Sequence, residues 1–177
     1  MRVRTSIAAM LAAGLFVGGA ADARQTPVPA SDATDIVPEK LPHATPYGAP
    51  ISLQKATAVM QAAVAEANRR GWPMNVAVVD SGTNLVTFAR MDGAQLASIA
   101  IAEHKARAAA SFRRPTRMFD EAASKNASLL SLDGVIASRG GIPLIENGKI
   151  IGAVGCSGGT GSQDEAVCEA AAETINK

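Results

Sequence analysis

Several polar side chains lie where a predicted strand ends, beginning with Arg90 and Asp92. Side chains of these types can bind an anion and transfer a proton. A helix is predicted from Gln95 to Phe112, in which Ser98 and Lys105 recur on one face. Such a junction can bind a small carboxylated ligand, with Arg90 or Lys105 holding the anion and Asp92 transferring a proton. The same residues can instead form an ordinary helix start, in which Asp92 caps helix amides and pairs with Arg90.

A second polar group follows that helix in the sequence Arg113-Arg114-Pro115-Thr116. Pro115 ends the helix, and Thr116 is predicted to cap a short one from Arg117 to Lys125. Two arginines at a helix C-terminus are favourable in themselves, because they complement the helix dipole. They also suit carboxylate or propionate groups.

A glycine-rich turn over residues 156–162 leads into a third helix, predicted to start near Gln163. Backbone amides at a helix start can bind an anion, although the glycine spacing matches no nucleotide-binding motif. A plain turn is the alternative, with Ser162 as N-cap and Asp164 and Glu165 satisfying the helix dipole. The pattern does not separate these two interpretations.

Two hairpins are predicted to position these groups. Ile142–Glu146 and Lys149–Gly155 are joined by Asn147-Gly148, the dipeptide preferred in type I′ turns. Asn75–Val79 and Leu85–Arg90 flank a polar loop in the same way.

Further elements follow from local signals. Ser52 begins an amphipathic helix that ends at Gly71. Residues 126–139 read as irregular turns, with a further strand near Val135-Ile136.

Composition limits the classes of function. The chain has 177 residues and 47% hydrophobic content, enough for one core, but only 3% aromatic residues. Its formal net charge of +1 excludes a nucleic-acid binder that works through bulk electrostatics.

The N-terminus resembles an export signal. Arg2 and Arg4 precede an apolar run over 7–21, and Ala21-Asp22-Ala23 supplies a small-x-small cleavage site. The run is shorter than the ~20 residues that span a bilayer, so we expect no stable membrane insertion. The predicted organisation is a signal peptide over 1–23, a proline-rich linker or arm over 24–50, and a domain over 51–177, located in the periplasm or secreted.

Cys156 and Cys168 are the only cysteines. An oxidising compartment would permit a disulfide between them. A strand and a helix packed on it typically lie ~10 Å apart, too far for a bridge unless the pair sits near the tight turn. A disulfide and two buried thiols both remain open.

Six short motifs together resemble the GlcG/HbpS haem-degrading domain family, over about residues 52–176. They occur in the family's order: Val76–Asp80, Phe88–Ala94, Lys105-Ala106, Phe112–Thr116, Gly140–Leu144 and Ile151–Gly159. The resemblance implies an α/β fold with α/β/α layers and an antiparallel, profilin-like five-stranded sheet. It also implies a homo-oligomer, often an octamer. Cys156 departs from the family, since many members have Val there.

The resemblance further implies an exported haem-binding protein, with haem-degrading or haem-sensing activity as its extension. Arg113, Arg114 or Lys105 would pair with propionates, and Thr116 or His104 would approach the haem iron. Covalent attachment is excluded, because the sequence has no Cys-x-x-Cys-His.

Two other functions compete with haem binding. One is a cofactorless enzyme acting on a small carboxylated or aromatic-derived metabolite, with His104 as a second proton carrier. Its substrate-binding candidates are Arg90, Asp92, Ser98, Gly158 and Gly159. The other is an oligomeric partner of a membrane sensor.

We expect the exported product to begin near Arg24, because the charged start, the apolar run and the cleavage site occur together. Intact-mass measurement of that product checks this expectation. Retention of residues 1–23 would contradict it.

Overall fold

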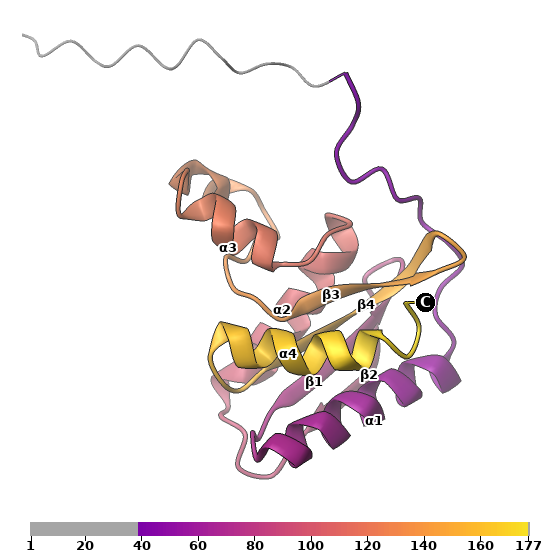
Figure 1. The fold of residues 1–177 in the computed structure, drawn as a ribbon, viewed down its shortest axis with the longest axis vertical. Helices are drawn as coiled ribbons and strands as arrows, with labels where there is room; N and C mark the ends of the chain where they lie inside the picture. Colours follow the sequence, from indigo (N-terminus) through magenta and orange to yellow (C-terminus); the bar gives the residue numbers. More distant parts are fainter. Residues whose placement is uncertain (1–38, 177) are drawn as a thin grey trace, which may run out of the picture. The chain divides into compact units, whose positions relative to one another are not determined.

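The computed structural model describes residues 39–176 (Figure 1). The predicted signal peptide and the first part of the proline-rich arm lie outside the described residues.

Four antiparallel strands form one sheet in the order β2-β1-β4-β3. They are β1 (Asn75–Asp80), β2 (Leu85–Arg90), β3 (Gly141–Glu146) and β4 (Lys149–Ser157). Both predicted hairpins are present, and β1 and β4 pair in the centre to join them. The β3–β4 turn is tight because its two residues both have positive φ, 50° and 72°.

The sheet has four strands, so the five-stranded expectation was wrong in its count. Val135 and Ile136 have no regular secondary structure, and they follow a turn in which Gly134 takes a positive φ of 81° that breaks an extended run. The arm adds a short contact to β4 on the side where β1 has ended at the Asp80–Gly152 pair. Tyr47 makes a single parallel bridge with Ile150, and the Gly48 amide donates to the Ile150 carbonyl at 2.8 Å.

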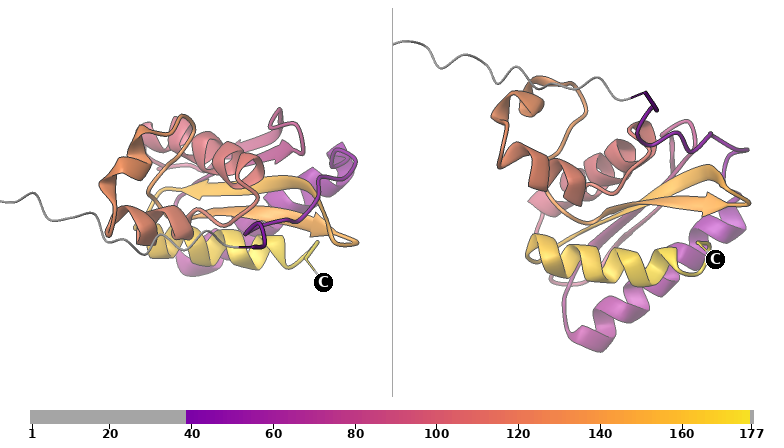
Figure 2. Two further views of the ribbon diagram at one scale, coloured as in Figure 1. Left: turned by 90° about the horizontal axis from the view of Figure 1, so that it is seen from above. Right: turned by 45° about the horizontal axis from the view of Figure 1, so that its top comes forward.

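Helices cover both faces of the sheet, as the predicted layers require (Figures 1 and 2). Helices α1 (Leu53–Arg70) and α4 (Gly161–Ala172) lie on one face, and α2 (Ala97–Ser111) lies on the other. The short helix α3 (Arg117–Ala123) and the 3₁₀ turn η1 (Ala127–Ser131) follow α2.

The α2 face of the sheet has a core built almost entirely of alanine and valine. A Cβ added to Gly155 would lie 2.1 Å from the carbonyl oxygen of Ala102. Helix α2 therefore sits directly on β4, and the scarcity of large side chains in the sequence is what permits this contact.

Helix α1 begins and ends where its sequence signals place it. The Ser52 side chain accepts a hydrogen bond from the Lys55 amide, and Gly71 follows the last turn with φ of 69°. The amides of Gly71 and Trp72 donate to carbonyls of the last turn, which is a Schellman motif.

The caps of the other helices differ from expectation. Thr160, rather than Ser162, caps α4 and forms a capping box with Gln163. Thr116 occupies the N-cap position of α3 but makes no cap hydrogen bond. Asp92 does not cap α2, which starts without a side-chain cap.

A disulfide joins Cys156 at the end of β4 to Cys168 in α4. Their Cα atoms are 5.7 Å apart, within the range that a bridge requires. The usual strand–helix spacing does not apply here, because α4 folds back from the tight turn that immediately follows Cys156. The bridge fastens the last helix to the central strand.

Replacing both cysteines with Ala should lower the free energy of unfolding by about 2–4 kcal/mol, since the closed loop no longer restricts the unfolded chain. Urea unfolding of the oxidised protein, the reduced protein and the double variant measures the effect. Reduction should leave the double variant unchanged, and equal stability of all three would contradict a disulfide.

Candidate functional site

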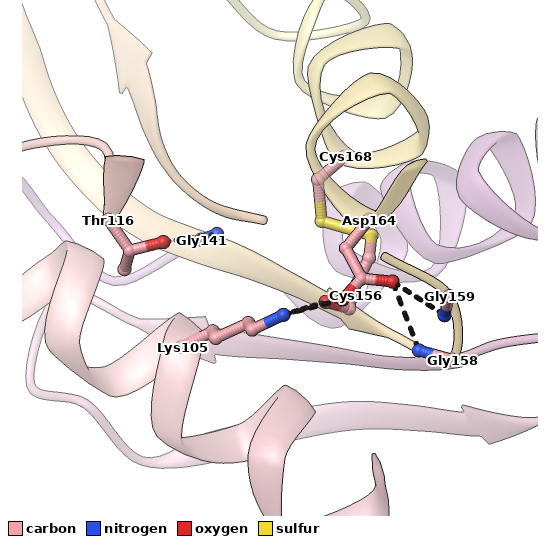
Figure 3. Close-up of a disulfide and its surroundings, with 8 residues drawn as sticks. All are labelled: Lys105, Thr116, Gly141, Cys156, Gly158, Gly159, Asp164 and Cys168. Carbon is pink, nitrogen blue, oxygen red and sulfur yellow. Dashed lines mark hydrogen bonds and ion pairs between the residues drawn. A yellow bond between two sulfur atoms is a disulfide. The ribbon is translucent and has the colours of Figure 1, made fainter. Parts of the chain in front are cut away.

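Lys105 and Asp164 form a buried ion pair at the end of β4 (Figure 3). The Lys105 Nζ lies 2.6 Å from Asp164 Oδ2 and also donates to the Cys156 carbonyl oxygen at 3.2 Å. Their side chains are only 1% and 3% exposed. Lys105 comes from α2 and Asp164 from α4, so the pair connects helices on opposite faces of the sheet.

The second oxygen of the Asp164 carboxylate occupies the glycine-rich turn. Its Oδ1 accepts hydrogen bonds from the amides of Gly158 and Gly159 at 3.0 and 2.9 Å (Figure 3). The turn is thus an anion site whose anion belongs to the chain itself. The glycine amides do bind an anion, as the first interpretation predicted. That anion is Asp164, which the second interpretation had placed at the helix start.

The electrostatics of Lys105 reflect its position in the core. Burial lowers the pKa of Lys105, while the charge and hydrogen bond of Asp164 oppose that shift. With both partners enclosed, neither presents an atom to a ligand at the surface.

Thr116 is also buried and used internally. Its hydroxyl oxygen accepts a hydrogen bond from the Gly141 amide at 2.9 Å, and its own amide donates to the Gly141 carbonyl at the same distance. Gly141 has no room for a side chain, because a Cβ there would lie 2.3 Å from the Lys105 carbonyl oxygen. The Thr116 contact therefore secures the start of β3 against α2 and α3.

The turn after α2 places Arg113 in a left-handed conformation, with φ of 56°. The Arg113 amide donates to Ala110 O and the Arg114 amide to Ala109 O, which again forms a Schellman motif. The equivalent position after α1 is Gly71, the residue that tolerates this conformation without steric cost. Arg113 is an unusual choice for that position.

Aromatic rings lie beside both guanidinium groups of this turn. Arg113 lies over the Tyr47 ring at 5.7 Å and Arg114 over the Phe119 ring at 5.6 Å from the centroid. Phe112 contacts Phe119 edge-on at 5.1 Å, and its carbonyl accepts a hydrogen bond from Arg114. Within residues 39–176, neither arginine forms an ion pair with a carboxylate.

His43 lies in the arm, four residues before Tyr47 of this cluster. Its imidazole is half-buried, and its pKa is lowered first by burial and then by the charges of Arg114 and Arg113. The Tyr47 hydroxyl, four residues on, donates to the carbonyls of Ala110 and Ser111 and so attaches the arm to the end of α2. We call these residues the arginine-turn cluster: His43, Tyr47, Phe112, Arg113, Arg114 and Phe119.

The sequence pattern singled out the two arginines of the cluster but not His43. A lone histidine in a proline-rich segment belongs to no helical or strand pattern that would predict its neighbours. His104, in contrast, was a candidate because of its neighbour Lys105. It lies on the exposed side of α2, with Nε2 3.2 Å from the Gly134 carbonyl oxygen.

The residues proposed for the competing enzyme are not brought together as one set. Arg90 and Asp92 line an open cavity of about 350 Å³ with Asn68 and the apolar side chains of Val64, Ala89 and Met91. Ser98, in the first turn of α2, is fully buried, and its hydroxyl has no hydrogen-bond partner among the described residues. The amides of Gly158 and Gly159 are already taken by Asp164.

Residues 39–176 contain no group of three or more His, Cys, Asp or Glu arranged to hold a metal ion. None of the helices in that range is both long and apolar enough to cross a membrane.

The sequence of this chain is similar to a known protein family and to individual relatives. The model of the family described as haem degrading protein HbpS-like matches residues 51–173. Protein GlcG of Escherichia coli is 38% identical over 108 residues, covering 60% of this chain and 81% of GlcG.

Solved structures extend the similarity to the fold. A double mutant of Streptomyces reticuli HbpS has a TM-score of 0.69 and 29% identity, covering 80% of this chain and 97% of that one. A PduOC–haem complex has a TM-score of 0.66 and 26% identity, covering 72% of this chain and 96% of that one.

We expect Asp164→Ala to lower the free energy of unfolding by about 3–5 kcal/mol, because it leaves the Lys105 ammonium buried without a counter-charge. Lys105→Met should cost less, since Asp164 keeps both glycine amides. Chemical unfolding measures both.

Glu103→Ala is the matched control, because it breaks the exposed Glu103–Arg107 pair and should cost about 0.3–0.5 kcal/mol. Losses of the same size for Asp164→Ala and Glu103→Ala would contradict a structural role for the buried pair.

Proposed function

Because the chain belongs to the HbpS-like family of haem degrading proteins, we propose that it is an exported haem-binding protein whose site is the arginine-turn cluster. The observation that carries this placement is the left-handed Arg113. A non-glycine residue in that conformation costs about 1–2 kcal/mol, and the chain ends α1 with glycine in the same motif. Backbone strain of this kind concentrates at functional sites.

The charges of the cluster support an anionic ligand. Arg113 and Arg114 are adjacent cations without carboxylate partners among the described residues, and burial, with the charge of Arg113, lowers the pKa of Arg114. A bound carboxylate would relieve their mutual repulsion through charge-assisted hydrogen bonds. Two propionates on one edge of a porphyrin match two neighbouring guanidinium groups.

The aromatic side chains support a flat, apolar ligand body. Tyr47 is 46% exposed and offers ring surface beside Arg113, while Phe112 is half-buried. The proposed haem therefore lies against the surface of the turn rather than inside a deep pocket. When bound, haem supplies an iron whose reactivity is set by its axial ligand.

Lys105 and Thr116 are left out of the proposed site. The Lys105 ammonium is neutralised by Asp164, and the Thr116 hydroxyl holds Gly141. Thr116 could approach iron only if its contact with Gly141 opened.

Export rests on the N-terminal signal, and the Cys156–Cys168 disulfide supports it, because such bonds persist in oxidising compartments. Periplasmic or secreted location, haem degradation and haem sensing belong to the proposal. Homo-oligomerisation, with the octamer common in the family, is part of it too, and light scattering would measure it.

The cavity beside Arg90 and Asp92 favours a second candidate, the binding of a small carboxylated metabolite. Its three apolar side chains and its one guanidinium suit a carboxylate with a short apolar body. Haemin titration followed at the Soret band separates the two candidates, because a flat response would leave only this one.

We expect Arg113→Gly to have opposite effects on stability and binding. Removing the strained side chain should raise the free energy of unfolding by about 1 kcal/mol. Losing one charge-assisted pair, at about 1.5–3 kcal/mol, should weaken haemin binding by about tenfold or more. Replacing both Arg113 and Arg114 with Ala should weaken binding further without unfolding the protein.

Gly71→Ala makes the reverse change at the end of α1 and serves as the control. It should lower stability and leave haemin affinity unaltered. Unchanged affinity in Arg113→Gly would remove the arginine turn from the site.

A further inference from the structure

We propose that His43, in the arm that precedes the HbpS-like domain, supplies the axial ligand to haem iron at the arginine turn. This inference rests on the proposed function. It goes beyond the family match, which begins at residue 51 and so does not include His43.

Imidazole is the commonest metal ligand among protein side chains, and few imidazoles are present in this chain. The sequence has two histidines, His43 and His104, and both cysteines are held in the disulfide. The Tyr47 hydroxyl lies 3.0 and 2.8 Å from the carbonyl oxygens of Ala110 and Ser111, to which it donates. An imidazole nitrogen is also a better ligand for haem iron than a neutral hydroxyl such as that of Thr116.

The position of His43 distinguishes it from His104. His43 is half-buried and within the electrostatic influence of both Arg113 and Arg114. The Arg113 guanidinium lies 5.7 Å from the ring centroid of Tyr47, four residues after His43, so this part of the arm lies beside the groups that would pair with propionates. His104 is exposed on α2 and already lies against the Gly134 carbonyl.

The arm is held firmly enough to position a ligand. Tyr47 attaches to the end of α2 through its hydroxyl and to β4 through its bridge with Ile150. The amide of Ile150 also donates to the Pro46 carbonyl at 2.8 Å. Two neighbouring elements therefore fix the chain a few residues after His43, which makes this part of the arm a wall of the site rather than a linker.

The test uses the ferric haemin complex of the mature chain, measured by Soret absorbance and electron paramagnetic resonance. In His43→Ala the Soret maximum and the iron signal should both change, and added imidazole should restore them by filling the vacated position. His104→Ala is the matched control, and its spectra should equal those of the unsubstituted protein.

Metal-free protoporphyrin IX separates ligation from packing. It has the same propionates and ring but no iron, so His43→Ala should leave its affinity within about twofold while weakening haemin binding at least about fivefold. Arg113→Gly should weaken both porphyrins alike.

Three results would overturn the inference. The first is a His43→Ala complex with unaltered spectra, and the second is a spectral change in His104→Ala instead. The third is equal weakening of haemin and metal-free porphyrin in His43→Ala, which would make His43 a packing residue. In each case haemin still binds, so the proposed function survives, whereas failure of the unsubstituted protein to bind haemin ends both.

Discussion

The fold depends on neutralising one buried ammonium group. Lys105 points from α2 to the end of β4, where its charge is matched by Asp164 and one carbonyl. A lysine enclosed in this way is tolerated only with a counter-charge and good hydrogen bonds. That requirement fixes the glycine turn, whose amides hold the other oxygen of Asp164, and it fixes the start of α4 above the same strand.

The two sets of charges in this molecule have different consequences. The Lys105–Asp164 pair is closed and satisfied, so it stabilises the fold and leaves nothing for a ligand. Arg113 and Arg114 instead lie side by side without a carboxylate partner within residues 39–176, and Arg113 has the left-handed backbone conformation that favours glycine. The backbone cost at Arg113, together with two guanidinium groups that lack a carboxylate partner among the described residues, is the physical reason to place binding at this turn.

Sequence reasoning succeeded where the signal was local. Ser52 and Gly71 bound α1 and Asn147-Gly148 turns the β3–β4 hairpin, since caps and tight turns are decided by a few adjacent residues. It failed where distant residues decide. Lys105 and Asp164 are 59 residues apart, and the local sequence around either residue does not predict their contact. Val135 and Ile136 are β-branched but pair with no strand of the sheet, and the position of His43 beside the arginine turn depends on residues far along the chain.

The buried ion pair and the disulfide both involve α4, the last helix of the fold. Asp164 and Cys168 both belong to α4, and their partners, Lys105 and Cys156, precede it in the chain. A polypeptide that emerges from its N-terminus cannot complete the core until almost all of it is available. For the exported protein proposed above, this late closure would keep the precursor in an unfolded, translocation-competent form while it crosses the membrane.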